Sequence, residues 1–328
     1  MGNHRLLVTE VEKKNEYREQ SKNRSSWKQE IQGRMERLWL QDPEQFNPER
    51  DCIQRERITK TLEVLTSTVD LKGKSVADLG CGAGVLSRLI RDKGATVDAV
   101  DIAGNALACL KMGEMERIRP IQDALPSTSL ADEFYDVVVC TEVIGFLPQK
   151  THRLFFSELS RVVKLDGHVV CSTEFDLSTE SPLERFNAIA ETEFTIDTWV
   201  LSYHRLFIRL CQFFEKPAYL ADLNKRPEVR NTEMEKRRTL VGKWLLKLNV
   251  TTVGSFFWSG VALVSVPIAR WLRQSPKIMN QLEKVSYFIW SEEGISHALF
   301  VGRKRPLEFP LPQNEIPREM RHKKEVWE

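Results

Sequence analysis

A β-strand and a helix meet at closely spaced glycines in the stretch Val76-Ala77-Asp78-Leu79-Gly80-Cys81-Gly82-Ala83-Gly84. An apolar run that ends in such glycines is typical of a strand followed by a tight turn. Residues 85–93 then predict a helix, because Leu86 and Ile90 share one face and Gly94 follows its end. Because a ligand can approach bare backbone in a turn of this kind, we expect a binding site there.

Strand-like and helix-like segments alternate around this turn. Strands are expected at 76–80, 96–101, 135–140 and 168–173, and later at 285–290 and 297–302. Helices are expected at 53–65, 85–93, 105–112 and 152–163, with a turn at 164–167. This alternation predicts an α/β fold with a doubly wound, mostly parallel sheet.

The composition excludes several classes of protein. With 41% hydrophobic and 29% charged residues, the chain of 328 residues is neither fibrous nor wholly disordered. Its net charge of +2 gives no global signal for nucleic-acid binding. The six cysteines form no C-x-x-C pair, which disfavours a zinc site. Several lie inside apolar runs, which predicts reduced, buried thiols in a cytosolic protein. The polar N-terminal residues 1–20 predict no secretory signal.

The charges around the glycines favour one cofactor. Asp101 lies 21 residues after Gly80, where an acid can hydrogen-bond both hydroxyls of a ribose. The glycines read G-x-G-x-G rather than G-x-G-x-x-G, and the carboxylate of Asp78 would repel a pyrophosphate. S-adenosylmethionine carries a sulfonium and an ammonium and no phosphate. It is therefore favoured over NAD, and a nicotinamide dehydrogenase is a distant alternative.

At this point the chain resembles the class I, seven-stranded, Rossmann-like S-adenosylmethionine-dependent methyltransferases, over about residues 50–175. Besides the glycine loop, the resemblance depends on Asp101, Ile121-Gln122-Asp123-Ala124, Thr141-Glu142-Val143-Ile144 and the turn at 164–167. It implies a seven-stranded sheet, with Asp78 near the methionine, Asp101 at the ribose and Asp123 beside the adenine amino group. The implied cofactor site comprises Asp78, Gly80, Cys81, Gly82, Gly84, Asp101, Ile102, Asp123, Ala124 and Glu142.

Candidate catalytic bases lie near the same edge of the sheet. Methyl transfer mainly requires alignment of acceptor and methyl group, and an oxygen or nitrogen acceptor can also need a base. Glu142, Glu174 and Asp176 follow expected strands, and Tyr203 and His204 lie in the region that comes next. From these, Glu142, Glu174 and His204 are our candidates. No His-rich or Asp-rich cluster appears, so no metal is expected.

Some methyltransferase subclasses are disfavoured. No Asn-Pro-Pro-Tyr-like tetrapeptide follows the strand at 135–140, which counts against enzymes that methylate DNA adenine or protein glutamine. No Pro-Cys pair occurs there, so Cys140 is interpreted as a core thiol rather than a nucleophile. Where relatives that methylate quinones and small molecules often have Glu-His, this chain has Gly145-Phe146. A catalytic histidine is therefore not carried over from them.

The region after residue 175 offers the one clue to the acceptor. Leu248–Ala269 is a run of 22 residues without a charged side chain, long enough to cross a bilayer as a helix. Residues 225–247 before it carry eight Lys or Arg against three Asp or Glu. The run can be buried core or a cap, a membrane element lying on the surface, or a true span. The basic residues suit either a solvated helix face or anionic lipid.

Five regions follow: an N-terminal helical segment (1–70) that acts as a lid, a cofactor-binding core (71–175), a helical insert (176–284), the last two strands (285–303) and a charged tail (304–328). We predict a methyltransferase for a small or lipid-like acceptor, with the methylated atom (oxygen, nitrogen or carbon) undetermined. The alternatives are a methyltransferase of protein or RNA that docks through the basic insert, and an inactive interaction protein at a membrane. We expect a cytoplasmic protein, with membrane association left open and the oligomeric state undetermined.

Overall fold

The computed structural model describes residues 27–113, 115–175, 182–223 and 251–305. Predictions for the segments 1–26, 176–181, 224–250 and 306–328 lie outside the described residues. These include Asp176, the basic run at 225–247 and nearly all of the charged tail.

A seven-stranded sheet with the order β3-β2-β1-β4-β5-β7-β6 forms the centre of the protein. Its strands are β1 (Ser75–Leu79), β2 (Thr96–Asp101), β3 (Ile118–Gln122), β4 (Tyr135–Thr141), β5 (Val163–Glu174), β6 (Phe194–Ser202) and β7 (His297–Lys304). The first five run parallel, and β7 lies antiparallel between β5 and β6. The predicted mostly parallel, doubly wound sheet is confirmed.

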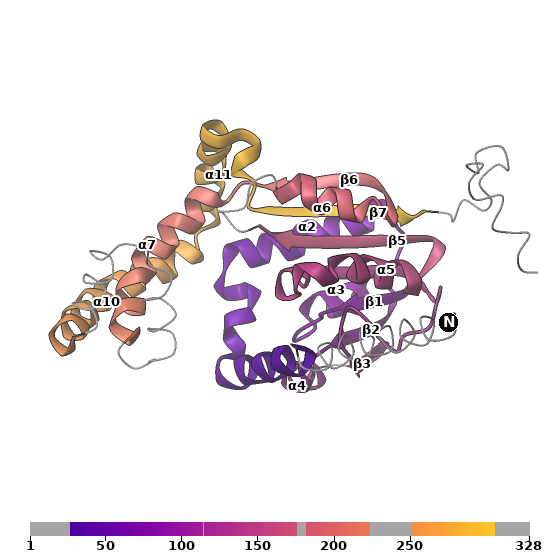
Figure 1. Cartoon of the computed structure of the whole chain (residues 1–328), viewed down its shortest axis with the longest axis horizontal. Coiled ribbons are helices and arrows are strands. Elements are labelled where there is room, and N and C mark those ends of the chain that lie inside the picture. The colour runs from indigo at the N-terminus through magenta and orange to yellow at the C-terminus, as the bar shows by residue number, and fades with distance from the viewer. Residues whose placement is uncertain (1–26, 114, 176–181, 224–250, 306–328) are drawn as a thin grey trace, which may run out of the picture.

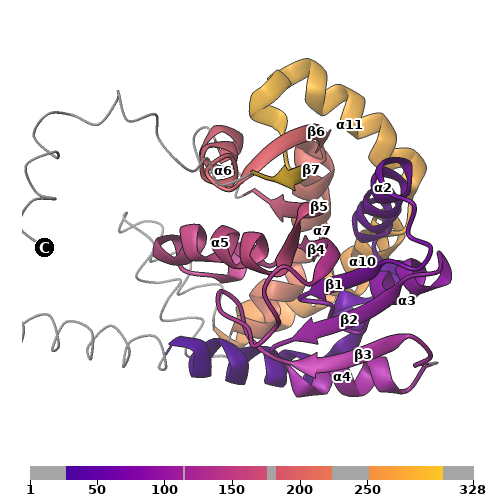
Figure 2. The same ribbon diagram turned by 90° about the vertical axis from the view of Figure 1, so that its right-hand side faces the viewer.

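Helices cover both faces of the sheet, as Figure 2 shows. α2 (Cys52–Thr68), α3 (Val85–Asp92) and α4 (Gly104–Lys111) pack on one face, and α5 (His152–Val162) and α6 (Pro182–Ala190) pack on the other. The central strands are therefore buried on both sides, which explains why β1 and β4 are nearly continuous apolar runs. A further helix at residues 27–41, here called the N-terminal helix, precedes them.

The strand predicted at 285–290 is wrong, because these residues end helix α11 (Pro276–Trp290). Pro276 starts that helix, and Met279, Leu282 and Ser286 follow at helical spacing on its buried side. The β-branched and aromatic side chains that suggested a strand are mostly exposed. A helical face with a packing partner has overridden local strand propensity.

The strand that pairs with β7 on the side away from β5 is β6, which lies within the region predicted to be mostly helical. Its alternation of apolar residues begins at Phe194 and Ile196, but the register then shifts between Ile196 and Thr198. Such a bulge interrupts the period of two that identifies a strand. The helical insert therefore lies between the last two strands rather than before them.

The predicted turn at 164–167 is also corrected, since these residues lie within β5. Tyr135 pairs with Val163 and Val137 pairs with His168, so β5 carries extra residues opposite β4. The irregular pairing accommodates the Lys164–Gly167 segment without ending the strand.

Three helices form what we call the helical arm: α7 (Arg205–Asp222), α10 (Thr252–Arg273) and α11. In Figure 1 the arm extends away from the sheet, with α7 and α10 side by side. The buried-core alternative for the uncharged run is therefore wrong over the described residues, since only 11% of the apolar window in α10 is buried.

Phe300 of β7 lies within a cluster of aromatic rings that includes Phe156, Phe186, Phe194 and Trp199. Because Phe300 is fully buried, Phe300→Ala should lower the free energy of unfolding by about 3–5 kcal/mol. Phe288→Ala is the matched control, since Phe288 is 86% exposed, and should change it by less than about 0.5 kcal/mol. Urea denaturation of both variants measures the difference. Equal losses would contradict this description of the core.

Candidate functional site

A cavity of about 1230 Å³ lies at the carboxyl ends of β1, β2, β4 and β5. Ligands of open α/β sheets bind at this edge. Most of the predicted cofactor residues line it, namely Asp78, Gly80, Cys81, Gly82, Asp101, Ile102, Asp123 and Glu142. Gly84 and Ala124 lie in the same loops but outside the lining. The sequence thus predicted residues that the fold brings together from four separate strands.

Two positions of the loop require glycine, because of their backbone conformation and because neighbouring side chains leave no room for a Cβ atom. Gly80 has φ +80°, and a Cβ there would lie 2.2 Å from Cγ2 of Val143. Gly84 has φ +71°, and a Cβ there would lie 2.2 Å from Cδ1 of Leu110. Both values lie in the left-handed region that disfavours other residues. Gly80 therefore lets the loop pass Val143, and Gly84 lets helix α3 begin close to α4.

Asp101 ties the glycine loop to the end of β2. Its two carboxylate oxygens accept hydrogen bonds from the backbone N–H groups of Gly82, at 2.9 Å, and Ala103, at 2.8 Å. Burial raises the pKa of Asp101, while these bonds lower it. The carboxylate is thus held rigidly in the cavity wall, as a ribose-binding acid needs to be.

Asp78 is almost fully buried beneath the loop. Burial raises the pKa of Asp78 to about 6, the hydrogen bond from Ser87 Oγ lowers it, and nearby Asp101 adds to the rise. A buried carboxylate is costly to ionise in the free protein, so its charged form is strongly stabilised when a cation binds beside it. This environment fits the predicted role near a positively charged ligand.

Asp123 organises its own loop. One oxygen accepts a hydrogen bond from the Ala124 N–H, and the other accepts from the N–H and hydroxyl of Ser129. Although burial raises the pKa of Asp123, the bonds from Ser129 outweigh it and lower the pKa overall. Lys28 of the N-terminal helix donates to the carbonyl oxygens of Ala124 and Ser127. The contact of Asp123 with adenine stays a prediction.

The N-terminal helix closes one side of the cavity. Trp27, Ile31, Met35 and Trp39 line it at helical spacing, as a lid would require. The carboxylate of Glu36 accepts hydrogen bonds from the N–H groups of Gly104, at 2.7 Å, and Asn105, at 2.9 Å, at the start of α4. This contact anchors the helix against the core.

Two glutamates lie close together in the lining of the cavity. Glu142 follows β4, Glu174 ends β5, and their carboxylate oxygens lie within 4.8 Å of each other. Glu142 has φ +61°, a strained value for a non-glycine residue, and its carboxylate accepts a hydrogen bond from Ser172 Oγ at 2.8 Å. Burial raises the pKa of Glu142, and the nearby charge of Arg57 lowers it. Strained residues with perturbed pKa values are typical of functional sites.

Arg57 of α2 is a site residue that the sequence analysis missed. It lines the same cavity, its Nε lacks a hydrogen-bond partner, and the charges of Glu142, Asp78 and Glu174 act on it. Burial lowers the pKa of Arg57, while the three carboxylates raise it. The position of Arg57 in the sequence could have indicated that it points inward, because it lies one turn before buried Thr61 on the inward face of α2.

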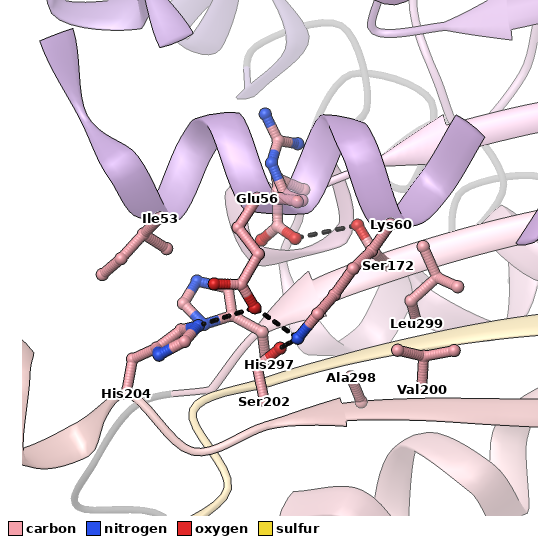
Figure 3. Close-up of a pocket in the computed structure, with 12 residues that line it drawn as sticks. Ile53, Glu56, Lys60, Ser172, Val200, Ser202, His204, His297, Ala298 and Leu299 are labelled. Carbon is pink, nitrogen blue, oxygen red and sulfur yellow. Dashed lines mark hydrogen bonds and ion pairs between the residues drawn. The ribbon is translucent and has the colours of Figure 1, made fainter. Parts of the chain in front are cut away.

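His204 lies elsewhere, in a second, smaller pocket of about 20 Å³ that shares Arg57 and Glu142 with the first. Figure 3 shows His204 facing Glu56, with Lys60 and Ser202 beside them and His297 on the same wall. His204 is buried, with Nε2 3.4 Å from Glu56 Oε1, and it does not line the large cavity. A catalytic role for His204 stays a prediction, and the structure places its side chain in the smaller pocket rather than in the large cavity.

His297, the first residue of β7, was also missed. Its ligand atoms lie within 4.8 Å of those of Glu142 and Glu174, a set of the kind that can hold a metal ion. Burial lowers the pKa of His297 to about 4, so its ring is neutral at pH 7. The sequence offered no signal, because residues 142, 174 and 297 meet only when β7 pairs with β5.

Residues 77–171 match a protein-family model described as a methyltransferase domain. The match spans β1 to β5 and includes the glycine loop, Asp101, Asp123 and Glu142.

This central part of the chain carries a methyltransferase domain.

Curated relatives of the domain are ubiquinone biosynthesis O-methyltransferases. That of Pseudomonas fluorescens is 33% identical over 109 residues, which is 32% of this chain and 46% of the relative. That of Idiomarina loihiensis is 33% identical over 114 residues, or 30% and 47% of the two chains. The matched part thus spans just under half the length of these relatives.

Solved structures show a similar arrangement at low sequence identity. The N-methyltransferase NodS of Bradyrhizobium japonicum, in complex with S-adenosylhomocysteine, has a TM-score of 0.43 and 19% identity, over 52% of this chain and 89% of its own. Magnesium protoporphyrin IX methyltransferase of Synechocystis, with bound S-adenosylmethionine, has a TM-score of 0.39 and 20% identity, over 44% and 71%.

Replacing Asp101 by Asn should weaken S-adenosylhomocysteine binding about 100-fold, because each hydrogen bond to a charged group is worth about 1.5–3 kcal/mol. Asp166→Asn is the matched control, since Asp166 is an exposed residue of β5. Calorimetric titration measures both affinities, and thermal unfolding checks that each variant is folded. Equal affinities in the two variants would contradict a role of Asp101 in the site.

Binding should also weaken as the pH falls from about 7.5 to about 5. The raised pKa of Asp78, about 6, means that the free protein protonates this group within that range, and a neutral acid no longer offsets the ammonium of the ligand. Asp78→Asn should bind more weakly at neutral pH and show a flatter pH profile. A profile with the wild-type slope would show that another group titrates.

Proposed function

We propose that the protein transfers a methyl group from S-adenosylmethionine to a small, lipid-like acceptor. The observation that carries this proposal is the cavity that joins the glycine loop and its buried acids, Asp78 and Asp101, to Glu142 and Glu174. The names of the curated relatives support an acceptor of the quinone-precursor kind.

The chain's own residues would divide the work by charge. S-adenosylmethionine supplies an electrophilic methyl group on a sulfonium, and it also carries an ammonium and a carboxylate. Asp78 suits the ammonium, Asp101 the ribose hydroxyls, and Arg57 the carboxylate of the same ligand. The remaining loop residues, Gly80, Cys81, Gly82, Gly84, Ile102, Asp123 and Ala124, would shape the cofactor's surroundings.

Glu142 and Glu174 are the proposed proton acceptors. A hydroxyl acceptor lying between them and the sulfonium would lose its proton to a carboxylate as its oxygen attacks the methyl carbon. Because its pKa is raised, the carboxylate of Glu142 is a stronger base than that of an ordinary glutamate. Alignment within a cavity closed by the N-terminal helix supplies the larger part of the rate.

We further propose a cytosolic protein that meets its acceptor at a membrane surface. Among the described residues, one helix, Val253–Arg273, is long and apolar enough to cross a membrane by length and composition. Its exposure supports contact with lipid. The rival function, methylation of RNA or protein through the basic segment at 225–247, predicts a different acceptor.

Incubation with S-adenosylmethionine labelled in its methyl group tests these alternatives directly. Purified protein is offered a membrane lipid extract, total RNA or a protein extract, with Asp101→Asn as the background. We expect label in the organic-soluble fraction of the lipid reaction, at least about tenfold above that background. Label in RNA or protein alone would replace the proposed acceptor class. Cofactor binding without transfer to any of the three would contradict the proposed acceptor classes.

A further inference from the structure

The exposed face of α10 carries an uninterrupted row of apolar and small residues. At about 100° per residue, these positions fall within about 120° of the helix circumference over five turns. Their exposure is high, with Val253 at 80%, Phe256 at 83% and Leu263 at 79%. We call this row the apolar stripe: Val253, Phe256, Phe257, Gly260, Leu263, Val264, Pro267 and Trp271.

The opposite face of α10 is already occupied. Ser265, Ala269 and Leu272 are buried there, and Ser255 Oγ donates a hydrogen bond to the carbonyl oxygen of Ala221 in α7. Helix α10 is therefore packed against the protein on one face, and the stripe is exposed on the other. Contiguous exposed apolar surface of this size marks a site of interaction.

We infer that the apolar stripe binds the surface of an anionic lipid bilayer, with the axis of α10 parallel to the membrane plane. The inference rests on the proposed membrane-surface function but not on the identity of the acceptor.

The packing of α10 excludes a true span. Its partner α7 carries five charged residues, Arg205, Arg209, Glu215, Lys216 and Asp222. Arg273 at the end of α10 forms ion pairs with Glu215 and with Asp51 before α2. Insertion of α10 across the hydrocarbon would carry these charges in with it or break the pairs, at a cost of several kcal/mol for each buried charge.

The charges around the stripe select an anionic surface. The end of α10 and helix α11 carry Arg270, Lys277 and Lys284 against Glu283, besides Arg273, whose charge is already paired with Glu215 and Asp51. Positive charge beside an apolar face is the composition that binds anionic lipid. A second copy of the chain would bring the same positive charges together, which disfavours self-association through this face.

The arm begins beside the proposed acceptor end of the cavity. His204, at the start of α7, contacts Glu56 of α2, and Glu283 of α11 accepts a hydrogen bond from the Tyr203 N–H at 3.0 Å. The same helix α2 carries Arg57 into the large cavity. A membrane-bound arm would therefore be connected through one helix to the site that receives a lipid-like acceptor.

Vesicle flotation of the full chain tests the inference. The probes are vesicles of phosphatidylcholine alone and of phosphatidylcholine mixed with phosphatidylglycerol. We expect the protein to float with the mixed vesicles, and the double variant Phe256→Ser, Leu263→Ser to lose at least about tenfold of that partitioning. The matched control is Met112→Ser, Leu165→Ser, which removes two exposed apolar residues outside the arm and should float like the wild type.

Four outcomes would overturn the inference. Wild-type protein that floats with neither vesicle shows that the stripe does not bind lipid. Equal flotation of both double variants shows that another surface binds. A dimer in solution that only the α10 variant dissociates assigns the stripe to a second copy. Resistance of bound protein to alkaline carbonate would replace the parallel orientation with a span. Calorimetric titration with S-adenosylhomocysteine accompanies each variant, so loss of flotation with intact cofactor binding separates this failure from that of methyl transfer.

Discussion

The carboxylate of Asp101 holds together the parts of the predicted cofactor site that lie on different strands. By accepting hydrogen bonds from Gly82 and Ala103, it joins the loop after β1 to the start of α4, which follows β2. The loop can adopt this position because Gly80 and Gly84 tolerate left-handed backbone and close neighbours. Asp78 lies beneath the same loop, so the position of the buried acid also depends on this arrangement.

The proposed acceptor end of the cavity depends on a different interaction, the attraction between buried groups of opposite charge. Three carboxylates act on Arg57, and its charge in turn lowers the pKa of Glu142. Each of these groups would be costly to bury alone, and together they form a polar part of the cavity wall. A second polar pocket behind this wall, with His204 and Glu56, connects it to the helical arm (Figure 3). The protein thus places its buried charges where sheet, α2 and arm meet.

Much of the core could be predicted because its signals are local. Strand 96–101 was predicted with its observed bounds, and β1, β4, α3 and α5 differ by one residue or so. Buried parallel strands leave apolar runs, and glycines mark the turn between β1 and α3. β3 was not predicted, and a turn was expected inside β5. Two further errors lie at β6, whose bulge interrupts the period of two, and at 285–290, where α11 packs its inner face against α7 and α2. In both places a partner distant in sequence determined the local structure.

The sequence by itself determined the methyltransferase core and the acids that line its cavity, because the glycine spacing and the intervals to Asp101, Asp123 and Glu142 are set along the chain. Only the tertiary structure decided which other side chains join them. Arg57 and His297 come from elements far away in sequence, and His204 is turned into a separate pocket by its place at the start of α7. The exposure of α10 also depends on the tertiary structure. The uncharged run is compatible with a core helix, but in the fold α7 covers only one face of α10. Local pattern specifies what an element is, whereas the surface that remains uncovered depends on every element around it.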